Sequence, residues 1–158
     1  MRRDAEWTLP RLHIVTDADI LRRPTFPELA ARICVEGGDG VALHLRGHGG
    51  AAPRITARVL NERARKLRPV VQASGTLLVM NDRVDVARVS GVKAVQLGGG
   101  SLSSTDMSAL GGPLRIGRSV HSVREAVAAT DADWILVGTL FPSGSHPGRA
   151  GAGTDRVA

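Results

Sequence analysis

Residues 77–97 read LLVMNDRVDVARVSGVKAVQL, and this stretch decides the fold. Two short apolar runs, 77–81 and 93–97, enclose a segment whose apolar residues recur with helical spacing. The stretch therefore predicts a strand, a helix over 83–90 and a second strand. Two strands joined through a helix lie parallel in one sheet, with a right-handed crossover. We therefore expect an α/β protein built from repeated βα units.

The same alternation extends in both directions along the chain. It predicts further strands over 11–16, 40–45, 114–118 and 133–138, and further helices over 26–37, 53–68, 103–110 and 121–130. Several of these apolar runs stop on polar residues. In parallel β/α proteins the carboxyl ends of the strands share one face, where ligands bind, so the polar residues should converge there. The prolines, Pro69 among them, lie outside the expected strands or at helix starts, because proline lacks an amide donor.

Composition narrows the classes of function. The chain has 158 residues, enough for one domain, and aromatic residues are only 3% of them, which disfavours the base-stacking surfaces of nucleic-acid-binding proteins. A net charge of +6 favours anionic ligands. The lone Cys34 lies in an apolar helical pattern and is expected to be a buried, reduced thiol. No apolar run reaches transmembrane length, so we expect a cytoplasmic protein with neither nucleic-acid nor membrane partners.

The chain divides into three expected segments. Residues 1–10 form an N-terminal extension, residues 11–143 form a partial barrel, and the glycine-rich residues 144–158 form a flexible tail.

His121 is the candidate catalytic residue. It follows the fifth expected strand and opens a helix, whose dipole disfavours the imidazolium, so a neutral ring there can take a proton. Alternatively, it only caps the helix or packs on the strand. Ser119 lies on the same side of this strand as Gly117, and its hydroxyl can bind a ligand oxygen.

Asn81, Asp82 and Gln96 end the two strands of the opening stretch. The Asn81 amide can donate to phosphate and the Asp82 carboxylate can hold Mg²⁺, although either residue can instead cap the following helix. Gln96 precedes a loop, Gly98–Gly100, whose amides can approach an anion. This loop lacks the glycine spacing of a nucleotide-binding motif.

His44 and Arg46 share one side of the second strand, where the guanidinium of Arg46 suits a phosphate or a carboxylate. The alternative is an ion pair with a nearby carboxylate. Zinc binding by His44, His48 and His121 is disfavoured, because their spacing matches no zinc motif. Thr139 opens a hydroxyl-rich loop that suits phosphate but is also common on flexible surfaces.

Three segments carry a family resemblance: 80–87 (MNDRVDVA), 95–97 (VQL) and 116–122 (IGRSVHS). In this order they resemble the thiamine phosphate synthase and thiazole tautomerase family, and the resemblance runs from 12–17 (LHIVTD) to 138–142 (GTLFP). It implies a (β/α)₈ TIM-barrel type of fold, incomplete here, with about six βα units.

The family resemblance implies two reactions. The synthase branch joins a pyrimidine pyrophosphate to a thiazole phosphate with Mg²⁺, and the tautomerase branch aromatises a thiazole phosphate carboxylate by proton transfer. Synthases typically read Gln-x-Arg-x-Lys in the second strand, where this chain has His44-Leu45-Arg46-Gly47-His48. Their second magnesium aspartate matches Ser101. These departures favour the tautomerase, which is an isomerase and needs no cofactor.

In the tautomerase interpretation, His121 moves the proton of a phosphorylated thiazole, and the remaining candidates bind that substrate: His44, Arg46, Asn81, Gln96, Ser119 and Thr139. The alternatives are a synthase with Mg²⁺ at Asp82, and a catalytically inactive phosphate-binding or regulatory relative. The family's phosphate-binding loops follow two further strands that this sequence lacks, so we expect a truncated barrel. Its open edges and uncovered apolar faces favour association into a homo-oligomer.

Overall fold

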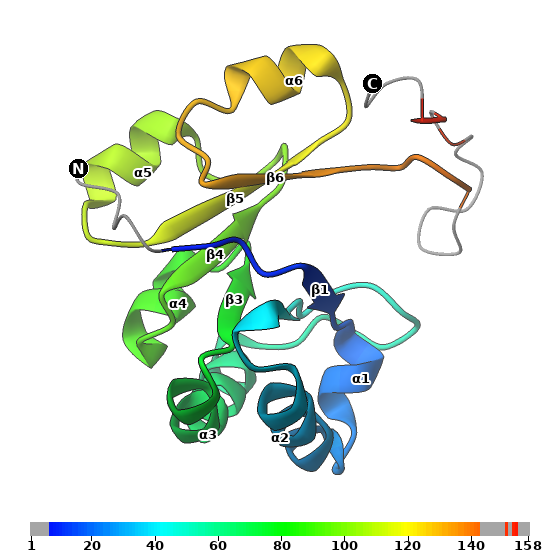
Figure 1. Ribbon diagram of the computed structural model, residues 1–158, viewed down its shortest axis with the longest axis vertical. Helices are drawn as coiled ribbons and strands as arrows, with labels where there is room; N and C mark the ends of the chain where they lie inside the picture. Colours follow the sequence, from blue (N-terminus) through cyan, green and yellow to red (C-terminus); the bar gives the residue numbers. More distant parts are fainter. Residues whose placement is uncertain (1–6, 143–150, 152, 155–158) are drawn as a thin grey trace.

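Six parallel strands form one sheet in the order β1-β2-β3-β4-β5-β6 (Figure 1). The computed structural model describes residues 7–142, 151, 153 and 154. The strands are β1 Leu12–Val15, β2 Val41–Leu45, β3 Leu77–Asn81, β4 Ala94–Leu97, β5 Arg115–Val120 and β6 Trp134–Val137. All five pairings are parallel, as the alternation of strands and helices predicts.

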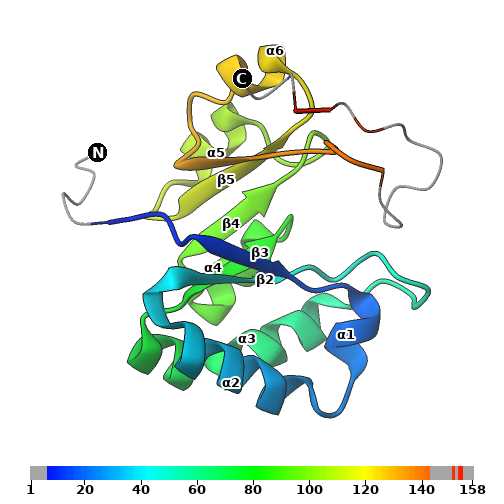
Figure 2. The ribbon, with the colours of Figure 1, turned by 45° about the vertical axis from the view of Figure 1, so that its right-hand side comes forward.

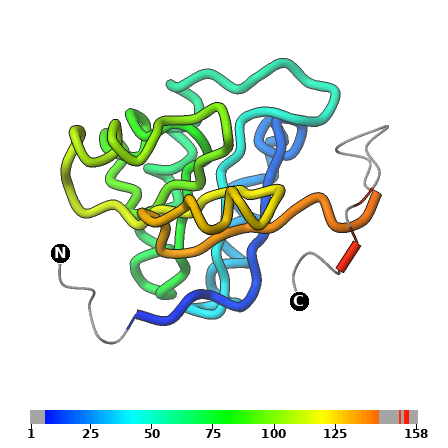
Figure 3. The backbone as a smooth tube through the Cα atoms, turned by 90° about the horizontal axis from the view of Figure 1, so that it is seen from above, coloured from blue at the N-terminus to red at the C-terminus, as the bar shows by residue number. Residues whose placement is uncertain are grey.

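The helices lie outside the sheet, which curls into a half-barrel (Figures 1 and 2). They are α1 Ala18–Arg22, α2 Phe26–Gly37, η1 Gly38–Gly40, α3 Ala57–Ser74, α4 Val84–Ser90, α5 Ser104–Leu110 and α6 Val123–Ala128. Between β2 and α3, residues 46–56 form a long loop that projects from the body of the molecule (Figure 3). The expectation of an incomplete TIM-barrel type of fold is confirmed.

Alternate residues of each strand face the two sides of the sheet. In β2, Leu43 and Leu45 join the large core beneath the helices, whereas Ala42 lies in a smaller cluster on the concave face with Val79 and Trp134. This alternation follows from the two-residue period of a strand. His44 has the same parity as Ala42, so its imidazole lies on the concave face.

The main differences from the sequence prediction are an additional helix and a longer α3. The short helix α1 was not predicted; its N-cap Asp17 accepts a hydrogen bond from the Ile20 amide at 2.8 Å. The helix predicted over 53–68 is Ala57–Ser74, and Pro69 lies inside it. Pro69 costs this helix one backbone hydrogen bond. The helix nevertheless continues, because Val70 and Val71 beyond it pack against the core.

The segment preceding β1 packs against the barrel. Trp7 lies 6.3 Å from Trp134, between ring centroids, and the Arg115 guanidinium stacks over the Trp7 ring at 4.0 Å. Most of the tail expected over 144–158 lies outside the described residues, so its flexibility stays a prediction. Within the described part of the chain, no helix is long and apolar enough to cross a membrane.

Candidate functional site

Polar side chains from all six strands meet on the concave face, and those of Asn81, Gln96 and Ser119 lie toward the carboxyl ends of their strands. They form two hydrogen-bonded groups, one on β1–β3 and one on β4–β6. The members of the first are His13, His44 and Asn81, and those of the second are Gln96, Ser119 and Trp134. The convergence expected from the strand ends is therefore present for four of the candidates, in two pairs.

The first group is a chain of two imidazoles and an amide. Nδ1 of His13 lies 2.9 Å from Nε2 of His44, and Nδ1 of His44 lies 3.2 Å from Oδ1 of Asn81. His44 is fully buried. Burial lowers its pKa to about 4, with a further decrease from the neighbouring His13, while the Asn81 hydrogen bond opposes the shift. Burial also lowers the pKa of His13. Both rings are therefore uncharged at neutral pH.

The second group links the end of β4 to β5 and β6. The indole Nε1 of Trp134 donates to Oε1 of Gln96 at 2.9 Å, and Nε2 of Gln96 donates to Oγ of Ser119 at 3.0 Å. Gln96 is only 2% exposed, and both ends of its amide are used within the protein. Ser119 is less buried than Gln96 and is the more accessible end of this group.

Asp82 lies directly after β3 and has a left-handed backbone, with φ +60°. Its Oδ1 accepts the hydroxyl of Ser101 at 2.5 Å, and its Oδ2 lies 3.8 Å from Nδ1 of His48. Ser101 Oγ also accepts the Gly98 amide at 3.0 Å. Few residues other than glycine adopt this backbone conformation, although Asp and Asn do so more readily than most. Hydrogen bonds through Ser101 thus link the Asp82 carboxylate, after β3, to the loop after β4.

Ser101 and Ser119 both line a pocket of about 310 Å³ between the loop after β4 and helix α6. Gly98 and Gly99 contribute backbone to the same pocket. It therefore touches one member of each hydrogen-bonded pair, Ser101 and Ser119, and reaches Asp131 in the loop before β6. Its lining is rich in hydroxyl groups, which suit ligand oxygens.

Arg46 lies beyond β2, beside the glycines of the projecting loop. Its backbone amide donates to Oγ1 of Thr16 at 3.0 Å, and a Cβ atom at Gly49 would lie 2.9 Å from its Nη2. Among the described residues, its buried Nε has no hydrogen-bond partner. The alternative of an ion pair therefore has no support in the described contacts, and binding of an anion by Arg46 stays a prediction.

His121 and Thr139 lie apart from both hydrogen-bonded groups. His121 is exposed directly after β5, and its Nδ1 contacts the carbonyl oxygen of Gly138 beyond β6. Its backbone amide donates to Oε2 of Glu125 at 2.7 Å, which completes the N-terminal cap of α6. Thr139 is half-buried, two residues beyond β6. No hydrogen bond among the described residues joins His121 to the other candidates.

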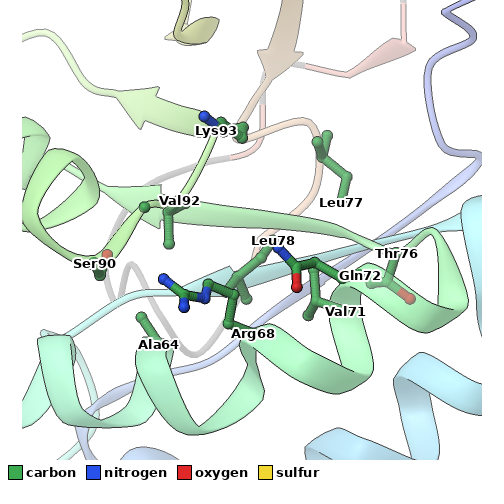
Figure 4. A pocket seen from close by; sticks show the side chains of 11 residues that line it. Ala64, Arg68, Val71, Gln72, Thr76, Leu77, Leu78, Ser90, Val92 and Lys93 are labelled. Carbon is green, nitrogen blue, oxygen red and sulfur yellow. The ribbon is translucent and has the colours of Figure 1, made fainter.

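A separate pocket of about 250 Å³ lies at the opposite end of the sheet, between α3 and α4 (Figure 4). Thr76 and Lys93, which line it, directly precede β3 and β4, so it opens at the amino ends of the strands. Arg68 extends into it from α3 (Figure 4). This position separates it from the candidate site, because the site residues cluster at the carboxyl ends.

The fold defines a barrel protein of the β/α class, and these polar groups are its candidate ligand site. The sequence matches the family described as thiamine monophosphate synthase over residues 12–158. The chain belongs to this family.

Individual relatives agree with the family match. The chain is 33% identical over 151 residues to a thiamine-phosphate synthase of Mycolicibacterium gilvum. The alignment covers 93% of this chain and 63% of that protein. The chain is 34% identical over 154 residues to a thiamine-phosphate synthase of Haloarcula marismortui, covering 93% and 70%. The solved structure of a thiamine phosphate pyrophosphorylase from Pyrococcus furiosus superposes with a TM-score of 0.69 at 25% identity, covering 94% and 67%.

These relatives correct the functional prediction. The expectation of a thiazole tautomerase, an isomerase, is wrong, because the similar proteins are named thiamine-phosphate synthases. The two departures that favoured it, His44-x-Arg46-x-His48 and Ser101, therefore occur in a chain that resembles synthases. The proton transfer assigned to His121 is a step of the tautomerase reaction, so this assignment is withdrawn with that prediction.

Two members of the hydrogen-bonded groups were missed by the sequence analysis. His13 lies within an expected strand, and two-residue alternation alone would have placed it on the same face as Val15. Trp134 opens β6, and its partner Gln96 lies two strands away. No spacing along the chain indicates that contact, because it depends on the register of three strands.

Proposed function

We propose that this chain carries out the thiamine phosphate synthase reaction, coupling a pyrimidine pyrophosphate to a thiazole phosphate with release of pyrophosphate. The observation that carries the proposal is its similarity to synthases over 93% of its own length. The chain spans 63% of the Mycolicibacterium relative and 60% of a synthase from Methanoregula boonei, so the activity of the whole relatives is transferred here as a proposal.

The candidate residues suit two phosphorylated substrates. Arg46 offers an anionic group a guanidinium whose Nε has no hydrogen-bond partner in the described part of the chain. Asn81 and Ser119 offer an amide and a hydroxyl on the concave face, beside the hydroxyl-lined pocket. Bound in this way, the two substrates are held close together and oriented, which is the main contribution that such groups make to a coupling reaction.

The residues around Asp82 fit a magnesium ion that is held largely by a substrate. Among the described residues, no cluster of three or more His, Cys, Asp or Glu side chains suits a metal. Mg²⁺ is usually bound through one or two carboxylates together with substrate phosphates, and Asp82 with the adjacent Ser101 hydroxyl supplies the protein part. When bound, the ion would neutralise negative charge on the pyrophosphate group, both in the substrate and as the group leaves.

The test is product formation from the two precursors, with and without Mg²⁺, in the wild type and in two matched variants. D82N removes the carboxylate but retains a residue that tolerates the left-handed backbone of Asp82. D85N removes the next carboxylate along the chain, which is paired with Arg83 on the exposed start of α4.

We expect Mg²⁺-dependent product from the wild type and from D85N, and a loss of at least tenfold, about 1.4 kcal/mol of barrier, in D82N. Absence of product from the folded wild-type chain would overturn the proposal. Equal rates for D82N and D85N would remove Asp82 from it.

A further inference from the structure

The hydrogen bond between Trp134 and Gln96 determines the orientation of the Gln96 amide. An indole N–H can only donate, so the amide atom that faces it at 2.9 Å must be the carbonyl oxygen, Oε1. The amide nitrogen is thereby turned toward Ser119, to which it donates at 3.0 Å. The donor-only chemistry of the tryptophan indole therefore fixes the orientation of the Gln96 amide.

The packing around the Trp134 indole leaves room for this contact with Gln96. Gly117 and Trp134 are register partners on β5 and β6. A Cβ atom at Gly117 would lie 2.2 Å from Oε1 of Gln96 and 2.3 Å from Cε2 of Trp134. Only glycine therefore leaves room for the indole and the amide to meet. Trp134 is 5% exposed and packs with Ala42 and Ala94 on the concave face.

The orientation of the Gln96 amide determines the hydrogen bonding of Ser119. Its Oγ accepts a hydrogen bond from Gln96, and among the residues that the structure describes no hydrogen bond uses its O–H, which can therefore donate to a ligand. We propose that Trp134 is a positioning residue of the synthase site: acting through Gln96, it fixes the Ser119 hydroxyl as a donor toward a hydrogen-bond acceptor of the ligand. The acceptor is an electron-rich atom, such as a phosphate oxygen of a substrate. This inference rests on the proposed synthase function.

The expected energetic signature is a coupling between Trp134 and Ser119, measured as a double-mutant cycle. W134F keeps an aromatic ring but removes the donor. We expect kcat/KM for the coupling reaction to fall about fivefold, as the loss of one uncharged hydrogen bond predicts. In an S119A background the same W134F change should have little further effect, because the group on which it acts is already gone.

W7F is the matched control. Trp7 packs against Trp134 at 6.3 Å but donates no hydrogen bond to Gln96, so W7F perturbs the same aromatic cluster and leaves the Gln96 contact in place. We expect near wild-type kcat/KM for W7F. A fall equal to that of W134F, or a W134F effect that is undiminished in S119A, would assign Trp134 a purely structural role and overturn the inference.

A second readout does not depend on turnover. The chain has two tryptophans, so a ¹H–¹⁵N spectrum of W7F identifies the Trp134 indole signal. This signal should show slow hydrogen exchange and should shift in S119A. Addition of thiazole phosphate should shift it in the wild type but not in S119A.

The two proposals therefore fail in different ways. An inactive chain whose indole signal still responds to S119A would reject the synthase function and keep the Trp134–Gln96–Ser119 linkage. A fast-exchanging indole that is insensitive to S119A would reject the linkage, even in an active enzyme. If W134F does not fold, the wild-type and S119A spectra decide the question.

Discussion

Replacing Ser101 with aspartate tests the site at the ends of β3 and β4 most directly. The Ser101 hydroxyl donates to Oδ1 of Asp82 at 2.5 Å, so S101D places a second carboxylate in contact range of the first. Two like charges about 4 Å apart repel by about 1 kcal/mol in water and about 4 kcal/mol at a protein-like effective dielectric constant of about 20. Because the Asp82 side chain is 27% exposed, we expect a loss of about 1–2 kcal/mol in unfolding free energy without metal.

Magnesium should reverse this loss. Two carboxylates form a better Mg²⁺ site than one, and a ligand at about one hundred times its Kd adds about 2.7 kcal/mol of stability. The assay is thermal unfolding of S101D and S101N in metal-free buffer and in excess Mg²⁺. S101N is nearly isosteric with S101D but uncharged. A shift of about 2–4 °C is expected for each kcal/mol in a chain of this size.

We expect S101D, unlike S101N, to be destabilised in metal-free buffer and to gain stability when Mg²⁺ is added. Equal melting temperatures for S101D and S101N in both buffers would refute the placement of Ser101 beside Asp82. Destabilisation of S101D without recovery in Mg²⁺ would show that the two carboxylates meet but do not share an ion.

Three further predictions concern the barrel and its buried groups. The pKa of His44 is lowered to about 4, so the unfolded chain binds more protons than the folded chain between pH 6.5 and 4. About 3 kcal/mol of stability should therefore be lost as the pH falls across this window, and H44Q should flatten a pH series of urea unfolding. G117A should reduce unfolding free energy by about 1–3 kcal/mol, since its Cβ meets Gln96 and Trp134; an unchanged denaturation midpoint would count against this packing. R118A should cost about 1–3 kcal/mol by the same assay, because Arg118 pairs with Asp131 at 2.6 Å and donates to the Leu102 carbonyl at 2.7 Å, whereas R88A at an exposed contact should cost less.

The sequence alone determined the order and type of nearly all the elements. Apolar runs such as 77–81 and 94–97 mark strands because a strand buried in a parallel sheet has few polar residues, and the segments between them have helical spacing. The family resemblance also followed from local motifs such as 80–87. The end of α3 was misplaced at Pro69, because packing of Val70 and Val71 outweighs the cost of proline inside a helix.

The choice between the two reactions of the family could not be made from single substitutions. His44, His48 and Ser101 differ from the usual synthase pattern, and taken alone they favoured the wrong branch. Similarity to synthases over 93% of the chain outweighs them, since it draws on many positions rather than three.

Which candidates touch one another was decided by the tertiary structure alone. The two-residue period of a strand places His44 and Gln96 on a face, but their partners depend on how neighbouring strands are aligned and how far the sheet curls. Asn81 meets His44 and Ser119 meets Gln96, whereas His121 turns to the Gly138 carbonyl. Trp134 reaches Gln96 only because Gly117 lies between their strands without a side chain. Contacts of this kind depend on register and curvature, which arise from packing of the whole chain and not from any local segment.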